Sequence, residues 1–368
     1  MLFDPKPKKK IDDVFDRKEE IEMLKRFLKS SEPLILVYGL RRMGKTSLIL
    51  STLNTLKLDY LFLDMREIVK EKSRVYYKDF LSLLESEINK KLKKGRFEEF
   101  VNYLRRIKGV NINVSESLFS VSFSWSKEER TEFVNVLEKL NEWSEDKNKR
   151  VIIIIDEAQE LENMRDYDLL PAIAYTFDHL DNLSFIITGS EVRVFSKFLR
   201  IKDVKSPLYG RGFSEIQLNP FDRDTSISFL KKGFEEFGID FKYGDKIYEE
   251  FGGNPGWLTL YGHTAVTIKD FDRAIERTKE IAKSLLKEEF MNFLYSRMIA
   301  KDRYIRIIKT CKDGCTWSDI KLSLESLEGR KVNDRTVYTL INNLLDYSFL
   351  IKEEKKYVLS DKLLAEVF

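Results

Sequence analysis

Several residue types that carry particular chemistries are scarce in this 368-residue chain. It contains two cysteines, Cys311 and Cys315, and two histidines, His179 and His263. Two cysteines are too few for a disulfide framework, and histidines so far apart cannot complete the usual ligand set of a zinc ion. No apolar run is longer than residues 151–155, whereas a membrane-spanning helix needs about 20 apolar residues. We therefore expect a protein with no membrane segment and no zinc site.

A strong charge of either sign is also missing. Lys and Arg number 64 against 61 Asp and Glu, a formal net charge of +3. This balance predicts no long-range field, so nucleic-acid binding would need a local basic patch. The amino terminus has charge but no apolar run behind it, which indicates a cytoplasmic protein without a secretory signal. We interpret the lysines of residues 6–10 as part of a solvated tail.

Apolar residues make up 43% of the chain, enough to bury more than one core. In the front part, short apolar runs alternate with helical segments, a pattern typical of α/β proteins with a parallel sheet. A helical stretch at 76–108 is followed by period-two alternation near 110–125, which predicts a small antiparallel hairpin attached to the core. The expected strands of the parallel sheet are residues 34–38, 60–63, 151–155, 185–188 and 213–218.

From about residue 219 the pattern changes to helices only, with a sharp break at 251–256. The final part suggests helices at 304–310, 317–323 and 335–347, followed by two short strands around a charged turn. Three helices and a hairpin are the order of a winged helix-turn-helix. We interpret Cys311 and Cys315, around the first turn of this part, as buried apolar fillers. The predicted division is a core at 1–218, a helical part at 219–287 and a winged helix at 288–368.

The sharpest motif is a complete G-x4-G-K-[ST] phosphate-binding loop at residues 39–46. A buried-strand run precedes it and a helix follows it, which is the context that such a loop requires. Its glycines let backbone amides turn toward phosphates, and the helix adds positive potential. We expect Lys45 to reach the β- and γ-phosphates and Thr46 to ligate Mg²⁺. The predicted nucleotide-binding residues of the loop are Gly39, Arg41, Arg42, Met43, Gly44, Lys45, Thr46 and Ser47.

Two carboxylates follow the most apolar run of the chain, at the strand end where α/β sheets place ligands. Asp156 suits the outer shell of a bound Mg²⁺, and Glu157 suits the base that orients and deprotonates an attacking water. A further apolar strand ends in Thr188 and Ser190. Either these hydroxyls contact the γ-phosphate or the attacking water, or they only cap the next turn. No guanine-reading Asn-Lys-x-Asp element occurs, which disfavours a GTPase.

With these motifs in place, the chain resembles the archaeal-type P-loop ATPases of the STAND group, close relatives of the AAA+ ATPases. The resemblance covers nearly the whole length and also rests on residues 15–20, 206–211 and 253–255. It implies sheet order 5-1-4-3-2, a helical lid and a C-terminal winged helix. It further implies that ATP or ADP binds with Mg²⁺, with Phe15 and Arg17 near the adenine and Pro255 of the lid on the nucleotide. Such proteins are switches that hydrolyse ATP slowly.

The chain departs from this family at one point. Related proteins often carry an arginine just after the strand that ends here at Thr188, whereas this sequence has Ser190-Glu191. An arginine that senses the γ-phosphate must then come from elsewhere. Arg211 and Arg193 are the candidates, although Arg193 is as readily an ordinary surface residue. A homo-oligomer in which a neighbouring subunit supplies the arginine is a further hypothesis.

The winged helix leaves two partner classes open. A winged helix usually inserts its third helix into the DNA major groove and contacts phosphates with basic residues. Here that helix offers Arg335 and two asparagines, and the charged turn of the wing is mixed in sign. The alternatives are a module that packs on the core or on an unknown protein partner, and one that reads duplex DNA, as in replication initiators or mobile-element proteins.

Overall fold

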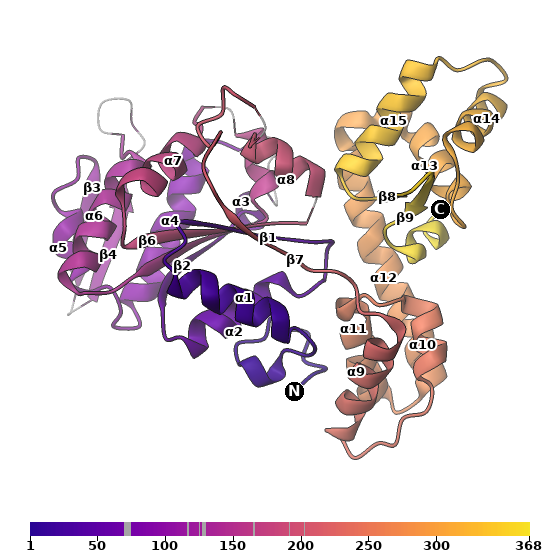
Figure 1. The fold of residues 1–368 in the computed structure, drawn as a ribbon, viewed down its shortest axis with the longest axis horizontal. Coiled ribbons are helices and arrows are strands. Elements are labelled where there is room, and N and C mark those ends of the chain that lie inside the picture. The colour runs from indigo at the N-terminus through magenta and orange to yellow at the C-terminus, as the bar shows by residue number, and fades with distance from the viewer. Residues whose placement is uncertain are drawn as a thin grey trace.

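The computed structural model describes residues 1–368 except 70–74, 116–117, 125, 127–129, 165, 191 and 202. Its α/β core lies on one side, and a helical lid and a winged helix lie together on the other (Figure 1). No described helix combines the length and apolar character needed to cross a bilayer. No group of His, Cys, Asp and Glu that could hold a metal by itself occurs among the described residues.

The core is built on a five-stranded sheet of order β2-β5-β6-β1-β7 in which all pairings are parallel. Numbered along the chain these strands give the order 5-1-4-3-2, so the predicted fold class and topology are confirmed. Every residue of β5 and β6 is buried, because helices cover both faces of the sheet. The strands are β1 (Leu34–Tyr38), β2 (Asp59–Asp64), β5 (Val151–Asp156), β6 (Leu183–Gly189) and β7 (Ser214–Gln217).

Alternation along β5 divides the core into two apolar layers. Val151, Ile153 and Ile155 pack in one cluster, and Ile152 and Ile154 pack in the other. The smaller layer lies under η1 (Ile11–Asp13), α1 (Lys18–Lys29) and α2 (Lys45–Thr55). The larger layer lies under α4 (Tyr77–Leu92), α5 (Phe100–Leu104), α6 (Phe133–Asp146), α7 (Leu170–His179) and α8 (Val192–Leu199). Two short helices, α3 (Arg66–Val69) and η2 (Ala158–Asn163), follow β2 and β5.

The predicted hairpin is confirmed as β3 (Val110–Ser115) and β4 (Leu118–Phe123), which pair antiparallel. Asn89 of α4 fixes it by exchanging two hydrogen bonds with the backbone of Val121, at 2.8 and 2.9 Å. The helical stretch expected at 76–108 is broken, because Gly95 and Phe97 adopt positive φ values of 67° and 64°. Trp125, which we placed at the end of the second strand, lies outside the described residues.

The lid and the winged helix follow each other as expected. The lid contains α9 (Arg223–Glu235), α10 (Gly244–Phe251) and α11 (Pro255–Ile268), and α12 (Phe271–Leu294) leads out of it. The winged helix contains η3 (Tyr295–Ala300), α13 (Lys301–Thr310), α14 (Trp317–Glu328), α15 (Asp334–Asp346), β8 (Leu350–Glu353), β9 (Lys356–Leu359) and η4 (Lys362–Glu366). The boundary that we expected at residues 287–288 falls inside α12, so one helix belongs to both parts.

The lid and the winged helix share one continuous apolar cluster. In α12, Phe290 packs against Phe349, with ring centroids 5.0 Å apart, and Phe293 packs against Tyr304 at the same distance. At the other end of this cluster Phe3, only 1% exposed, inserts among lid residues. We call residues 221–368 together with Leu2 and Phe3 the lid–wing body.

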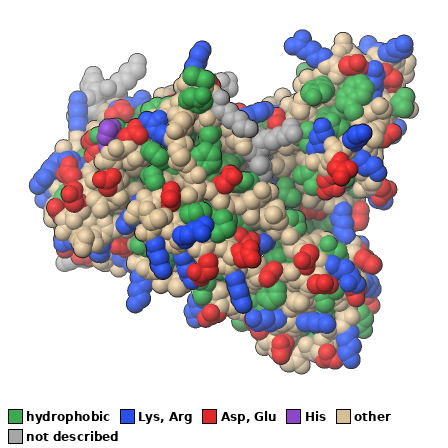
Figure 2. Space-filling view, viewed as in Figure 1, with side chains coloured by type: hydrophobic (Ala, Val, Ile, Leu, Met, Phe, Trp, Pro, Cys, Tyr) green, Lys and Arg blue, Asp and Glu red, His purple; other side chains and the backbone are tan. Residues whose placement is uncertain are grey.

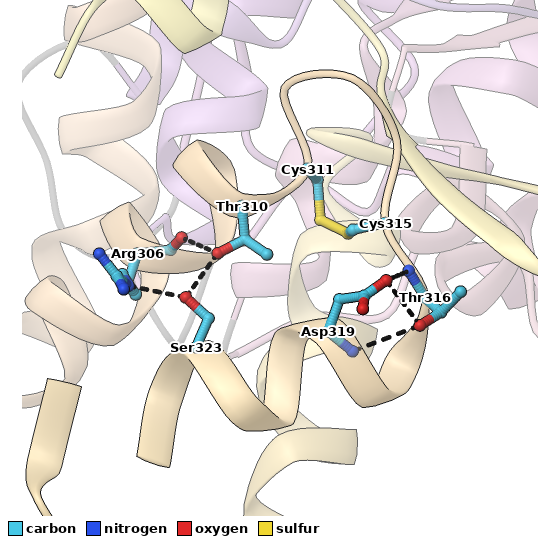
Figure 3. Close-up of a disulfide and its surroundings, with 7 residues drawn as sticks. All are labelled: Arg306, Thr310, Cys311, Cys315, Thr316, Asp319 and Ser323. Carbon is cyan, nitrogen blue, oxygen red and sulfur yellow. Dashed lines mark hydrogen bonds between the residues drawn. A yellow bond between two sulfur atoms is a disulfide. The ribbon is translucent and has the colours of Figure 1, made fainter. Parts of the chain in front are cut away.

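The interpretation of the two cysteines as separate fillers is wrong. Cys311 and Cys315 are buried, but they form a disulfide between the end of α13 and the start of α14 (Figure 3). Their spacing of 4 residues allows this bond because the chain turns back directly after α13. Next to the bond, Thr316 caps α14 by accepting a hydrogen bond from the Asp319 backbone at 3.3 Å.

The interpretation of the lysines of residues 6–10 as part of a solvated tail is wrong for Lys8, which is half-buried, whereas Lys6, Lys9 and Lys10 are exposed. The Lys8 ammonium donates to the carbonyls of Met1, Leu2 and Asp4 at 2.7 to 2.9 Å. The Lys8 backbone donates to Ser47 Oγ in α2 at 3.0 Å. Residues 1–10, which we call the N-terminal strap, therefore run from the lid to the helix that follows the phosphate loop.

Candidate functional site

The loop between β1 and α2 has the backbone that a phosphate-binding loop needs. A Cβ atom on Gly39 would lie 2.3 Å from the Leu218 carbonyl oxygen, so only glycine fits there. Gly44 precedes α2 with φ of 90°, a left-handed conformation that glycine adopts without strain. The loop lies at the carboxyl ends of the strands, where the N-terminus of an 11-residue helix favours anions.

Lys45 is buried beneath this loop, with 5% of its surface exposed. Its Nζ donates to the carbonyl oxygens of Gly39 and Leu40 at 2.9 and 3.1 Å, and it lies 3.9 Å from Glu157 Oε1. Burial lowers the pKa of the Lys45 ammonium, although the attraction of Glu157 opposes this effect. Because the ion pair with Glu157 is long, the buried ammonium favours an additional anionic ligand nearby.

Thr46 and Asp156 meet beside the loop. Thr46 Oγ1 donates to Asp156 Oδ2 at 3.3 Å, and Thr188 Oγ1 donates to Asp156 Oδ1 at 2.5 Å. Burial raises the pKa of Asp156, which is only 1% exposed, and the neighbouring Glu157 raises it further. A hydroxyl and a carboxylate oxygen are hard donors of the kind that Mg²⁺ prefers, so the residues present fit this ion.

Glu157 is held by two neutral side chains. Its Oε2 accepts hydrogen bonds from Ser190 Oγ and, at 2.6 Å, from Gln159 Nε2. Burial opposes its ionisation, but Lys45 and these two hydrogen bonds prevail and lower the pKa of Glu157 to about 2. The residue adopts a left-handed backbone (φ 55°, ψ 50°), and its amide donates to Thr188 Oγ1 at 3.0 Å. Thr188 and Ser190 thus bind the two carboxylates.

The predicted adenine and lid residues lie at the junction of the core and the lid. Phe15 packs edge-on against Phe229 of α9, with centroids 5.4 Å apart. Arg17 donates to the Asn219 carbonyl at 2.6 Å. Pro255 is the first residue of α11, and the backbone of the next residue donates to the Arg42 carbonyl at 3.1 Å. The start of α11 therefore touches the phosphate loop.

The structure does not bring Arg211 to this site. Its Nε donates to Asp178 at the end of α7, at 3.0 Å. Arg211 precedes β7, whose first residue, Ser214, pairs with Ile35 near the start of β1. It therefore lies at the amino ends of the strands, whereas the loop lies at their carboxyl ends. The side chain of Arg193 lies outside the described residues.

Sequence reasoning missed two charged residues of the site. Arg66, directly after β2, donates to Asp156 Oδ2 at 3.3 Å. Glu289 of α12 forms ion pairs with Arg41, at 3.1 Å, and with Arg42. No motif in the sequence marks either residue. Sequence reasoning also gave Gln159 no role, and its Oε1 is buried without a hydrogen-bond partner among the described residues.

Comparison with known proteins finds a matching family for the ATPase part and for the C-terminal part of the chain. Residues 14–260 match the model of a family described as an ATPase domain predominantly from Archaea. Residues 298–360 match that of the MCM protein C-terminal winged helix-turn-helix domain. No curated protein matches the sequence.

Solved structures agree with these matches. A Walker-type ATPase of Pyrococcus abyssi is 32% identical, with a TM-score of 0.81 over 100% of this chain and 99% of that one. The ORC2 protein of Aeropyrum pernix, in complexes with ADPNP and ADP, is 13% identical, with a TM-score of 0.59 over 100% of this chain and 96% of that one. The second likeness shows the fold alone. The predicted P-loop core, helical lid and winged helix are therefore confirmed.

Proposed function

Because the chain belongs to the family of ATPase domains found predominantly in Archaea, we propose that it is an ATP-hydrolysing switch of the STAND kind, in which the nucleotide controls how the lid–wing body packs on the core. One observation carries this proposal. Glu289, in the helix that leads into the winged helix, is ion-paired with Arg41 and Arg42 of the phosphate loop itself. An anion at the loop therefore acts on residues that already hold the lid–wing body.

Adenine nucleotides fit the residues of the site. Lys45 and the loop amides would hold the β- and γ-phosphates, and Thr46 and Asp156 would hold Mg²⁺. The metal supplies neutralisation of the charge on the phosphate oxygens. Arg17 and Phe15 at the lid junction would lie toward the adenine. The structural relative from Aeropyrum pernix, solved with ADPNP and ADP, supports this nucleotide class.

Glu157 is the residue that would accept the proton of the attacking water. Ser190 and Gln159 fix one of its carboxylate oxygens, which leaves the other directed toward Lys45. Attraction by Lys45 makes Glu157 a weak base in the protein alone. A phosphate that pairs with the Lys45 ammonium would partly neutralise its charge, weaken this attraction and raise the pKa of Glu157. Glu157 would thus become a stronger base when a phosphate occupies the loop.

The switch would act through two ion pairs and two hydrogen bonds between the loop and the lid–wing body. Besides the Glu289 ion pairs, Asn254 Nδ2 donates to the Arg41 carbonyl at 3.3 Å, and the Gly256 amide donates to the Arg42 carbonyl. A Cβ on Gly256 would lie 2.5 Å from Arg42 Cβ, so the lid helix and the loop are in direct contact. Phosphates compete with Glu289 for the two arginines, and the balance depends on the nucleotide.

A protein partner for the winged helix is favoured over DNA by its surface. Leu322, Leu327 and Tyr338 on α14 and α15 are 65%, 45% and 63% exposed. Apolar side chains are conspicuous on this part of the molecule in Figure 2. Lys321, a nearby base, is neutralised by Asp334 at 2.6 Å. A surface with exposed apolar residues and paired charges suits a protein partner better than phosphates.

Nucleotide binding with and without catalysis tests the main proposal. Lys45→Ala is expected to abolish binding of ATP in calorimetric titrations with Mg²⁺, whereas Glu157→Gln is expected to bind ATP and lose turnover. Lys29→Ala, which alters an exposed lysine at the end of α1, is the matched control and should behave like the parent. Hydrolysis at the parent rate by Glu157→Gln would refute the assignment of the base. No binding by the parent would refute the proposal.

DNA binding is tested by salt. Affinity for random duplex DNA that falls steeply between low and moderate salt would favour a nucleotide-dependent DNA-binding protein of the initiator or mobile-element kind. We expect no binding even at low salt. The hypothesis of a homo-oligomer in which Arg211 acts on a neighbouring site predicts a specific activity that rises with protein concentration and is lost in Arg211→Ala.

A further inference from the structure

The ends of β2 and β5 bring two carboxylates together. The strands pair in parallel register with Asp64 opposite Asp156, and the ladder continues through a hydrogen bond from the Met65 amide to the Asp156 carbonyl at 3.0 Å. Both side chains therefore lie at the carboxyl edge of the sheet, next to the phosphate loop. Asp64 lies on the strand that follows α2, and no motif in the sequence marks it.

Arg66 links these two acids. Its Nε and Nη2 donate to the two oxygens of Asp64 at 2.8 and 2.7 Å, the fork geometry that guanidinium groups form with carboxylates. The Arg66 amide adds a third hydrogen bond to Asp64 at 3.0 Å. The same Nη2 reaches Asp156 Oδ2 at 3.3 Å. Asp64 thus fixes the guanidinium at a position from which it also contacts Asp156.

The oxygen that Arg66 contacts is the one that faces the loop. Asp156 Oδ2 also accepts the hydrogen bond from Thr46 Oγ1, whereas Oδ1 is occupied by Thr188. In the protein alone, Arg66 therefore supplies positive charge at the carboxylate oxygen that lies beside Thr46. A divalent cation held by Thr46 and Asp156 would meet a guanidinium on the same oxygen, and two cations at one oxygen repel each other.

We propose that Arg66 is a positioning residue that neutralises Asp156 in the metal-free protein and competes with Mg²⁺ for Asp156 Oδ2. This inference rests on the proposed nucleotide-binding function. When Mg²⁺ binds, Arg66 gives up its contact with Asp156, which at 3.3 Å is the longest of the four. The three shorter hydrogen bonds to Asp64 keep the arginine in place. Before nucleotide binds, Arg66 compensates the negative charge of the buried Asp156. It also makes Mg²⁺ binding depend on the negative charge that the phosphates add.

The consequence is measurable as the dependence of nucleotide affinity on the metal. The readout is a ratio of dissociation constants for a fluorescent ADP analogue. The constant measured in EDTA is divided by the constant measured in saturating Mg²⁺. In Arg66→Ala and Arg66→Gln, the unneutralised Asp156 repels metal-free nucleotide and attracts Mg²⁺ more strongly. The ratio is therefore expected to rise about twofold to fivefold, the range for a half-exposed ion pair.

Two further variants keep the result interpretable. Arg66→Lys retains the charge and should restore a ratio near that of the parent. Arg200→Ala removes another ion-paired surface arginine, whose partner is Asp168 and not Asp156, and should leave the ratio unchanged. An unchanged ratio in both neutral variants would overturn the inference, as would an equal loss of affinity in EDTA and in Mg²⁺. Failure of the parent to bind ADP would instead overturn the proposed function, so the two failures are distinguishable.

Discussion

The contacts within the core and within the lid–wing body differ in kind from the contacts between these two bodies. Inside each body the contacts are apolar. The sheet lies between two buried clusters, and a third cluster runs unbroken from Phe3 through the lid to the wing. Between the bodies, polar contacts stand beside the packing of Phe15 on Phe229. They include the Glu289 ion pairs with the loop and the ion pair of Lys197 in α8 with Asp346 in α15.

This difference indicates which parts can move. Separating apolar surfaces that pack as tightly as a protein interior loses the free energy of their burial, so each body should remain intact. Partly exposed ion pairs contribute little and exchange readily for water or for another charged group. In the proposed switch, one body would therefore change its position relative to the other without the unfolding of either.

Removal of the Phe3 ring should have the largest effect on stability. The ring fills a space against two glycines, and a Cβ on Gly262 would lie 2.3 Å from it. Phe3→Ala is expected to lower the free energy of unfolding by about 3–5 kcal/mol, as for other large-to-small core substitutions. Chemical denaturation measures this loss. A loss below about 1 kcal/mol would show that the strap is not part of the apolar cluster.

A double-mutant cycle sharpens this prediction. Gly262→Ala alone should destabilise the protein because its methyl group overlaps Phe3, whereas the same change in the Phe3→Ala background should cost little. Additive effects of the two substitutions would contradict the packing of Phe3 against this glycine.

Reduction of the disulfide should have the next largest effect. The bond closes a short loop inside the lid–wing body, with a sequence separation of 4. Its loss is expected to lower stability by about 2 kcal/mol on the chain-entropy argument. The measurement is the thermal midpoint with and without reductant, and the Cys311→Ala, Cys315→Ala double variant is the control that reductant should not affect. A parent midpoint that is insensitive to reductant would contradict the prediction.

Substitution of Glu289 should affect position more than stability. Glu289→Gln breaks two partly exposed ion pairs, so the free energy of unfolding should fall by about 1 kcal/mol or less. The distance between spin labels, one on the core and one on the winged helix, should become more broadly distributed. Glu288→Gln, one residue earlier in α12, is the matched control. An unchanged distance distribution in Glu289→Gln would show that the bodies are joined by other contacts.

Substitution of Lys197 should have the smallest effect. Its side chain is 56% exposed, and we expect Lys197→Ala to change stability by about 0.5 kcal/mol or less. Combined with Glu289→Gln, it should broaden the distance distribution further. A loss of several kcal/mol would place Lys197 in a packed interface and would remove the contrast between the two kinds of contact.

Much of the fold and the centre of the site were accessible from the sequence because the features involved are local. The isoleucines of β5 predict a strand covered on both faces, and residues 39–46 determine their own loop geometry. The break after α4 had a signal in Gly95, but the apolar periodicity around it concealed the turn. The positive φ of Phe97, which completes the turn, has no sequence signal.

The missed residues depend on distant pairings. Arg66 reaches Asp156 only because β2 lies next to β5, a neighbour relation created by folding. Glu289 meets Arg41 and Arg42 across about 250 positions in sequence. Lys8 lies in a lysine-rich run, which composition predicts to be solvated. Its ammonium binds backbone carbonyl groups and its amide binds a serine hydroxyl, and composition does not predict such contacts.

The continuous α12 has a consequence for anyone who exchanges modules between relatives. Its 24 residues serve both the lid and the winged helix, and the apolar cluster on either side of residue 288 is one. A chimera joined at that position would pair half of a packed interior with a foreign half. The transplantable unit begins before α9, near Phe221, and a graft that respects it should also take Leu2 and Phe3 from the same donor.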